Sequence, residues 1–120
     1  VGRPLNSERD VISAASDLQE LGAVWLAISN GKEPLIVVGP DEAFRVDIPS
    51  VAKNVNPIGC GDSLTAGIAA AISEQREVPE AIRWGVACAT QNLEAVLPAR
   101  LDRTLVLEMA ENISVTGLKR

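Results

Sequence analysis

Histidine is absent from this 120-residue chain, and aromatic side chains are almost as rare. Without histidine, these residues cannot provide a histidine base or nucleophile, or the usual zinc sites. The only aromatic residues are Trp25, Phe44 and Trp84, so the core must be built from aliphatic side chains. A hydrophobic content of 47% over this length is enough to fold around such a core.

Cysteine, positive charge and long apolar runs are also scarce. Cys60 and Cys88 are too few for a disulfide framework and fit a reducing compartment. The net charge of −5 argues against nucleic acid as a partner, because nucleic-acid-binding surfaces are basic. No apolar run reaches the roughly 18 residues that cross a bilayer, and no signal peptide is visible. We therefore predict a cytoplasmic protein that binds neither nucleic acid nor membrane.

The most informative segment is the loop N-P-I-G-C-G-D-S at residues 56–63, which runs into a helix of small residues. Two glycines around one residue allow backbone conformations that a Cβ would forbid, and they leave amide N–H groups facing outward. The helix directs its own unpaired N–H groups and its positive dipole end to the same place, which favours phosphate. Asp62 would repel phosphate, so its presence predicts a second task, the handling of a hydroxyl proton during phosphoryl transfer.

A purely structural explanation covers the same residues. Glycine, aspartate and serine are common where helices begin, so Asp62 or Ser63 would simply cap this helix. Short glycine motifs also occur in many unrelated sequences. From the residues alone, both explanations stay open.

The segment N-P-I-G-C-G-D-S-L-T-A-G resembles the second signature of the ribokinase/PfkB family of carbohydrate kinases. The family pattern is Asp or Asn, Thr, any residue, Gly, Ala, Gly, Asp. The resemblance implies that the amides of Gly59, Cys60 and Gly61 form an anion hole and that Asp62 is the catalytic base. It also implies an α/β fold, namely the C-terminal part of a ribokinase-like fold.

The segment departs from the family pattern at two positions. Pro57 replaces threonine, which removes a hydroxyl group and one amide donor. Cys60 replaces alanine but keeps its backbone amide. Asn56 at the head of the motif resembles the branch that contains 1-phosphofructokinase and tagatose-6-phosphate kinase.

Two further segments resemble nucleotide-contacting parts of the family. Ser29-Asn30-Gly31 stands where the family has Ser-Leu-Gly-x-x-Gly, so the resemblance assigns nucleotide contact to Ser29 and Gly31; a plain hairpin turn explains the same residues. The helix that begins at Val78 corresponds to the region beside the adenine, so Asn92 would contact the nucleotide. Tight packing of a helix rich in small residues is the alternative there.

The remaining patterns predict a small sheet packed with helices. Helical spacing of apolar residues and capping signals predict four helices, at residues 8–21, 60–74, 78–97 and 101–113. Apolar runs between turn residues predict four strands: a buried parallel strand at 23–29, a strand at 35–38, a half-exposed strand at 43–48 and a short strand at 53–55.

The resemblance implies transfer of the ATP γ-phosphate to a hydroxyl group of a sugar or sugar phosphate, with Mg²⁺ as the metal. Because Val1 is not an initiator methionine and family members are much longer, we predict that residues 1–120 form a single domain from a longer sugar kinase. The missing N-terminal half carries the family's sugar-binding residues. The chain alone is therefore predicted to be inactive.

Two other functions are compatible with the sequence. The altered positions Pro57 and Asn30 would fit a non-catalytic nucleotide-binding or regulatory module that descends from a sugar kinase. An unrelated structural or interaction domain would use Gly59 and Asp62 only to start a helix. The sequence does not specify the sugar or the oligomeric state.

Overall fold

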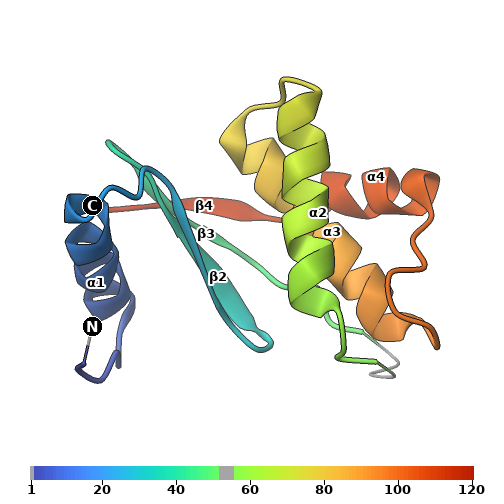
Figure 1. Ribbon diagram of the computed structural model, residues 1–120, viewed down its shortest axis with the longest axis horizontal. Helices are drawn as coiled ribbons and strands as arrows, with labels where there is room; N and C mark the ends of the chain where they lie inside the picture. Colours follow the sequence, from blue (N-terminus) through green and yellow to red (C-terminus); the bar gives the residue numbers. More distant parts are fainter. Residues whose placement is uncertain (1, 52–55) are drawn as a thin grey trace. The chain divides into compact units, whose positions relative to one another are not determined.

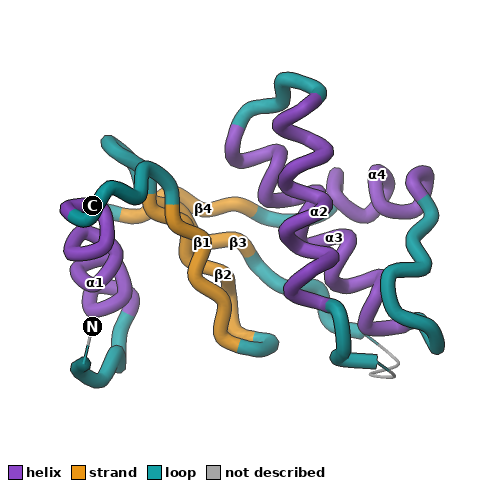
Figure 2. Tube along the Cα trace, viewed as in Figure 1, coloured by secondary structure: helices purple, strands orange, loops and turns teal. Residues whose placement is uncertain are grey.

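The structure, a computed structural model, describes residues 2–51 and 56–120, and these residues divide into two compact units. The first, called here the sheet unit, comprises residues 1–47 and 114–120, and the second, the helical unit, comprises residues 48–113. Figures 1 and 2 show the elements of each unit, which are described separately below. The strand predicted at 53–55 lies outside the described residues.

The sheet unit contains one helix and a four-stranded antiparallel sheet (Figure 2). Its elements are α1 (Glu8–Glu20), β1 (Leu26–Asn30), β2 (Glu33–Val38), β3 (Ala43–Val46) and β4 (Val115–Leu118). The strands lie in the order β1-β2-β3-β4, and each neighbouring pair is antiparallel. Helix α1 begins as predicted, because the Ser7 hydroxyl accepts a hydrogen bond of 3.1 Å from the amide of Asp10.

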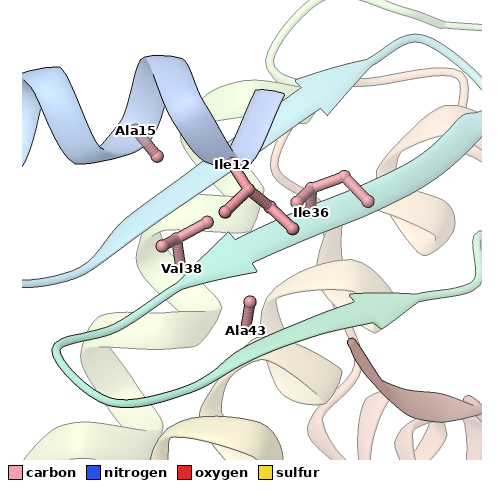
Figure 3. Packing of buried hydrophobic residues seen from close by; sticks show 5 residues of the cluster. All are labelled: Ile12, Ala15, Ile36, Val38 and Ala43. Atoms are coloured by element: carbon pink, nitrogen blue, oxygen red, sulfur yellow. The ribbon is translucent and has the colours of Figure 1, made fainter. Parts of the chain in front are cut away.

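The core of the sheet unit lies between α1 and one face of the sheet (Figure 3). Ile12 and Ala15 come from α1, and Ile36, Val38 and Ala43 come from β2 and β3. Val38 pairs directly with Ala43 across the two strands, and residues two apart along a strand share a face. The period of two in β2 therefore brings its isoleucine and valine onto the helix.

The prediction of a buried parallel strand at 23–29 was wrong. Strand β1 begins at Leu26, pairs antiparallel with β2 and is an edge strand in which Ala27 and Ser29 are exposed. A two-residue turn, Gly31-Lys32, joins β1 to β2, and such a short connection can link only antiparallel strands. Gly31 has φ of +57°, a left-handed conformation that favours glycine in this turn.

A strand begins at Ala43 as predicted, but the prediction that it is half-exposed was wrong. Strand β3 is shorter than predicted, and Phe44 and Val46 are both buried. These residues pair with Val37 and Leu35 of β2, which are buried as well, so the second face of these strands is as apolar as the face under α1. The fourth strand, β4, was not predicted; it pairs with β3 through Val46 and Val115.

The helical unit contains α2 (Cys60–Ser73), α3 (Val78–Glu94) and α4 (Arg103–Glu111). The starts of α2 and α3 agree with the sequence prediction, and Asp102 caps α4 by accepting a 3.1 Å hydrogen bond from the amide of Leu105. Within the described residues, no helix combines the length and apolar character needed to cross a bilayer.

Helix α3 ends at Glu94, three residues before the predicted end. The next residue, Ala95, is extended, with ψ of 144°. If the helix continued, the amide of Leu97 would bond to the carbonyl of Leu93. That carbonyl instead accepts a 2.9 Å hydrogen bond from the amide of Asn56, so the loop before α2 takes the place of a further helical turn.

Helices α2 and α3 pack backbone to backbone in the helical unit (Figure 1). A Cβ at Gly67 would lie 2.8 Å from the Cα atom of Gly85, and a Cβ at Gly85 would lie 2.7 Å from the carbonyl oxygen of Leu64. Both distances are shorter than real Cβ contacts allow. The small residues that the sequence places in these helices therefore set the distance between them, and this packing fixes α2 on α3.

Candidate anion-binding site

The loop that precedes α2 begins the helix without a side-chain cap. Gly59 is the N-cap residue, and it adopts the left-handed conformation with φ of +84° and ψ of 2°. No side chain makes the capping hydrogen bond, so the interpretation of Asp62 or Ser63 as a plain cap is wrong. Asp62 is instead the third residue of the helix, where a carboxylate interacts favourably with the helix dipole.

The backbone amides at this helix start include several without a protein acceptor. Among the described residues, the amides of Gly59, Gly61 and Asp62 donate to no carbonyl or side chain, whereas the amide of Ser63 donates to the carbonyl of Gly59 at 2.8 Å. The amide of Cys60 makes a long contact of 3.4 Å with the carbonyl of Pro57. Free amides and the positive dipole end therefore meet at one place, which is the physical requirement for binding an anion.

Asp62 presents its carboxylate to solvent beside these amides. It is exposed, and within the described part of the chain its side chain makes no hydrogen bond or ion pair. The neighbouring Ser63 is buried at 3% exposure, and its hydroxyl group has no described partner. The carboxylate of Asp62 is therefore available to a ligand in a way that the hydroxyl of Ser63 is not.

The two glycines of the motif, Gly59 and Gly61, differ in whether a residue with a side chain could replace them. Gly59 needs its left-handed φ, which other residues adopt at a cost of about 1–2 kcal/mol. Gly61 has no positive φ, and a Cβ added to it would meet nothing within 4 Å. Neither packing nor backbone conformation explains a glycine at position 61. Among the described residues, the space that a Cβ at position 61 would occupy is open.

Asn56 organises the loop, a role that the sequence analysis did not assign. Its side-chain oxygen accepts a 3.2 Å hydrogen bond from the amide of Ile58, and its side-chain nitrogen lies 3.3 Å from the carbonyl of Val96. A side-chain oxygen that bonds the amide two residues on is typical of asparagine in turns. The Asn-Pro pair at this position was the signal that could have predicted it.

Asn92 lies in α3 directly against the loop. Its side chain is completely buried, and its nitrogen donates to the carbonyl of Ile58 at 2.9 Å. Its oxygen accepts from the amide of Ala99, at 2.6 Å. Nucleotide contact by Asn92 stays a prediction, whereas the contacts described here are all with the chain itself.

The other two predicted nucleotide-contacting residues lie in the sheet unit. Ser29 is exposed in β1, and Gly31 is in the turn that follows it. The hairpin explanation accounts for the conformation of Gly31. Contact of either residue with a nucleotide stays a prediction.

A hollow of about 680 Å³ lies beside the C-terminal half of α3 in the helical unit. Apolar side chains from α4 and from the residues that follow α3 and α4 form part of its wall, namely Ala95, Leu105, Met109 and Ile113. Ala95 lines this hollow, whereas Asn92, which was predicted to contact the nucleotide, does not.

The two cysteines have different environments. Cys88 is buried, and burial raises the pKa of its thiol, in agreement with a core residue. Cys60 is half-buried, and its sulfur lies 3.3 Å from the side-chain nitrogen of Asn92. The residues that the structure describes contain no group of three or more cysteine and carboxylate side chains that could hold a metal ion. Any Mg²⁺ at this site would need other ligands.

Comparison with known proteins identifies the family. Residues 1–101 match the model of the pfkB family of carbohydrate kinases, and the chain belongs to this family. Over 85 residues it is 31% identical to 1-phosphofructokinase from Bacillus subtilis, an alignment that covers 71% of this chain and 28% of that enzyme. It is 36% identical over 59 residues to tagatose-6-phosphate kinase from Staphylococcus epidermidis, covering 49% and 19% of the two chains.

The fold is that of the ribokinase-like sugar kinases. The structure of Arabidopsis thaliana ribokinase complexed with ribose and ATP superposes with a TM-score of 0.83 over 92% of this chain and 36% of that one, at 22% identity. The predicted α/β fold class is therefore confirmed, although its sheet is antiparallel among the described strands. The chain spans roughly a third of the length of the relatives it matches, which fits a fragment.

Proposed function

We propose that this chain is the phosphate-handling part of a kinase that transfers the γ-phosphate of ATP to a hydroxyl group of a sugar phosphate. Membership of the pfkB family supports sugar phosphorylation, and the 1-phosphofructokinase and tagatose-6-phosphate kinase relatives favour a hexose phosphate as the acceptor. The observation that carries the proposal is the exposed carboxylate of Asp62 in the same helical turn as the free amides of Gly59 and Gly61.

In the proposed reaction, Asp62 orients the acceptor hydroxyl and accepts its proton. The hydroxyl oxygen forms a bond to the γ-phosphorus, and the bond between that phosphorus and the bridging oxygen breaks, so that ADP leaves with the electron pair. The amides of Gly59 and Gly61 donate hydrogen bonds to the charge that develops on the phosphoryl group. Because the transition state is loose, orientation by Asp62 contributes more than activation of the hydroxyl.

The described residues do not provide a complete Mg²⁺ site, so no step of this mechanism depends on a metal held by them. Magnesium bound to ATP would be held mainly by phosphate oxygens, as is common for this ion. The alignment covers 28% of the Bacillus subtilis enzyme, so we also propose that the remaining part of a longer protein supplies the sugar site. On this basis, we expect the 120 residues alone to be inactive.

The test is release of ADP by the full-length protein with MgATP. We expect turnover with one of fructose-1-phosphate, tagatose-6-phosphate, fructose-6-phosphate and ribose, each supplied separately, and only background release without sugar. ATP binding with no sugar-dependent release of ADP would contradict the proposal and would favour the non-catalytic nucleotide-binding module. Indifference to both ATP and phosphate would favour a structural domain.

Gly61→Ala tests whether the open space over the loop is used by a ligand. A Cβ at this position meets nothing within 4 Å, so we expect the folded state to be unchanged or more stable by up to about 1 kcal/mol. In contrast, kcat/KM for ATP should fall by at least about tenfold, because the methyl group occupies the approach to the amides. The measurements are urea unfolding and steady-state kinetics of the full-length protein. Unchanged kinetics would show that the amide of Gly61 does not contact the phosphates.

A further inference from the structure

The side chain of Asn92 makes several polar contacts with the candidate site, which packing between helices alone does not require. Its side-chain nitrogen lies within hydrogen-bond distance of three acceptors: the carbonyls of Ile58 at 2.9 Å and Asn56 at 3.4 Å, and the sulfur of Cys60 at 3.3 Å. The carbonyl of Ile58 is the closest of the three. The three acceptors lie in the loop before α2 and in its first residue, so one buried side-chain amide contacts the whole turn.

These contacts place the amide group of Asn92 directly beneath Gly59. The residues on either side of Gly59 are Ile58 and Cys60, and both are bonded to Asn92. A Cβ added to Gly59 would lie 3.6 Å and 3.8 Å from the oxygen and the nitrogen of the Asn92 side chain. The left-handed turn therefore packs against the Asn92 amide group at ordinary van der Waals distance.

The direction of the Gly59 amide follows from this contact. Peptide bonds are planar, and in the trans form the C=O and N–H groups of one peptide unit point in opposite directions. No peptide bond among the described residues is cis. Because Asn92 holds the carbonyl of Ile58 toward α3, the N–H of Gly59 in the same peptide unit must point away from α3. This is one of the amides that have no acceptor among the described residues.

The side-chain oxygen of Asn92 is also fixed by a hydrogen bond. It accepts from the amide of Ala99, which has a positive φ of 58° and follows Pro98. The side chain of Pro98 lies 3.4 Å from where a Cβ of Gly59 would be. Both polar atoms of Asn92 are thus fixed by backbone groups, so the side chain cannot rotate without losing hydrogen bonds on both sides.

We infer that Asn92 is a positioning residue that presets the outward direction of the Gly59 amide, and so acts on phosphoryl transfer without touching the nucleotide. The inference rests on the proposed function for its catalytic consequence, but the orientation of the loop is independent of it. A donor that is already oriented costs nothing to reorganise during reaction, whereas a donor that must be reoriented loses much of its effect.

The test compares Asn92→Leu with Thr90→Val in the full-length protein. Thr90 is a matched control, because it is a buried polar residue of the same helix whose hydroxyl donates only to the carbonyl of Val86, at 2.8 Å. For Asn92→Leu we expect kcat to fall by about 10²-fold, while KM for ATP changes by less than about threefold. Thr90→Val should retain kcat within about twofold.

A second measurement does not depend on activity. Hydrogen–deuterium exchange should be faster by at least about tenfold for the amides of residues 58–62 in Asn92→Leu than in Thr90→Val, at a temperature where both are folded. Asn92→Asp keeps the oxygen that accepts from Ala99 but loses both donor hydrogens, so it should show the same loss of kcat and the same faster exchange.

The outcomes separate the inference from the proposed function. A wild-type protein without turnover on any sugar would contradict the proposed function, and loop exchange would then decide the inference alone. Unchanged exchange in Asn92→Leu or Asn92→Asp would overturn the inference. A raised KM for ATP with unchanged kcat would also overturn it, because that result indicates direct contact with the nucleotide.

Discussion

Asp62→Asn is expected to lower kcat for sugar phosphorylation by about 10³-fold, within the range of about 10²–10⁴ that a positioned general base contributes. The substitution keeps the size of the side chain but removes the negative charge that orients the acceptor hydroxyl and accepts its proton. KM for ATP should change little or decrease, because the exposed carboxylate repels phosphate. The measurement is ADP release by the full-length protein with the sugar that the wild type uses.

The matched control for this substitution is Glu80→Gln. Glu80 is the third residue of α3, as Asp62 is the third residue of α2, so both carboxylates interact with the positive end of a helix dipole. Each substitution should cost less than about 1 kcal/mol of stability. Only Asp62→Asn should impair turnover. Equal kinetic effects of the two substitutions would mean that the carboxylate of Asp62 serves the helix and not the reaction.

This comparison also separates the proposed kinase from the two other functions. A non-catalytic nucleotide-binding module would bind ATP in both the wild type and Asp62→Asn, with no release of ADP from either. A structural domain would respond to the substitution only through the stability of α2. The structural-domain explanation predicts that a side chain caps α2, but no side chain does so. The remaining structural role for Asp62 is therefore its interaction with the helix dipole.

The sequence predicted the local part of the candidate site well, because glycine spacing and helix starts are local properties. The start of α2 at Cys60 and the cap of α1 by Ser7 follow from residues within one turn of each position. The left-handed conformation needed a glycine at position 59, and the sequence contains one. The assignment of Asp62 as the base still awaits the kinetic test.

What the sequence could not predict depends on residues that are distant along the chain. The end of α3 depends on a bond between Leu93 and Asn56, which are far apart in sequence, and the contacts of Asn92 depend on the same long-range packing. Strand β4 pairs with β3 although the whole helical unit separates them in the chain. The antiparallel pairing of β1 with β2 could have been predicted from the sequence, because the short turn at Gly31 allows no other pairing.

The contact between α2 and α3 carries the second large expected effect, since the candidate site is held on α3. Gly67→Ala should destabilise the helical unit by about 2 kcal/mol, although alanine favours helices over glycine by about 1 kcal/mol. Its Cβ would lie 2.8 Å from the carbonyl of Trp84 and from the Cα atom of Gly85, and these backbone atoms cannot move aside as a flexible side chain would. Gly67→Val should prevent stable folding of this unit.

The control is the same substitution in the same helix at Gly61, where a Cβ meets nothing. Gly67→Ala and Gly61→Ala should therefore change the free energy of unfolding in opposite directions. The difference separates the effect of the close contact between α2 and α3 from the effect of helix propensity. Urea unfolding followed by Trp84 fluorescence in a Trp25→Phe background reports on the helical unit, because Trp84 is buried there and the guanidinium groups of Arg76 and Arg103 lie 5.6 Å and 5.4 Å from its ring centroid. Equal stabilisation by both alanines would mean that α2 and α3 lie further apart than the structure describes. The loop would then be positioned by the hydrogen bonds of Asn92 and Asn56 alone.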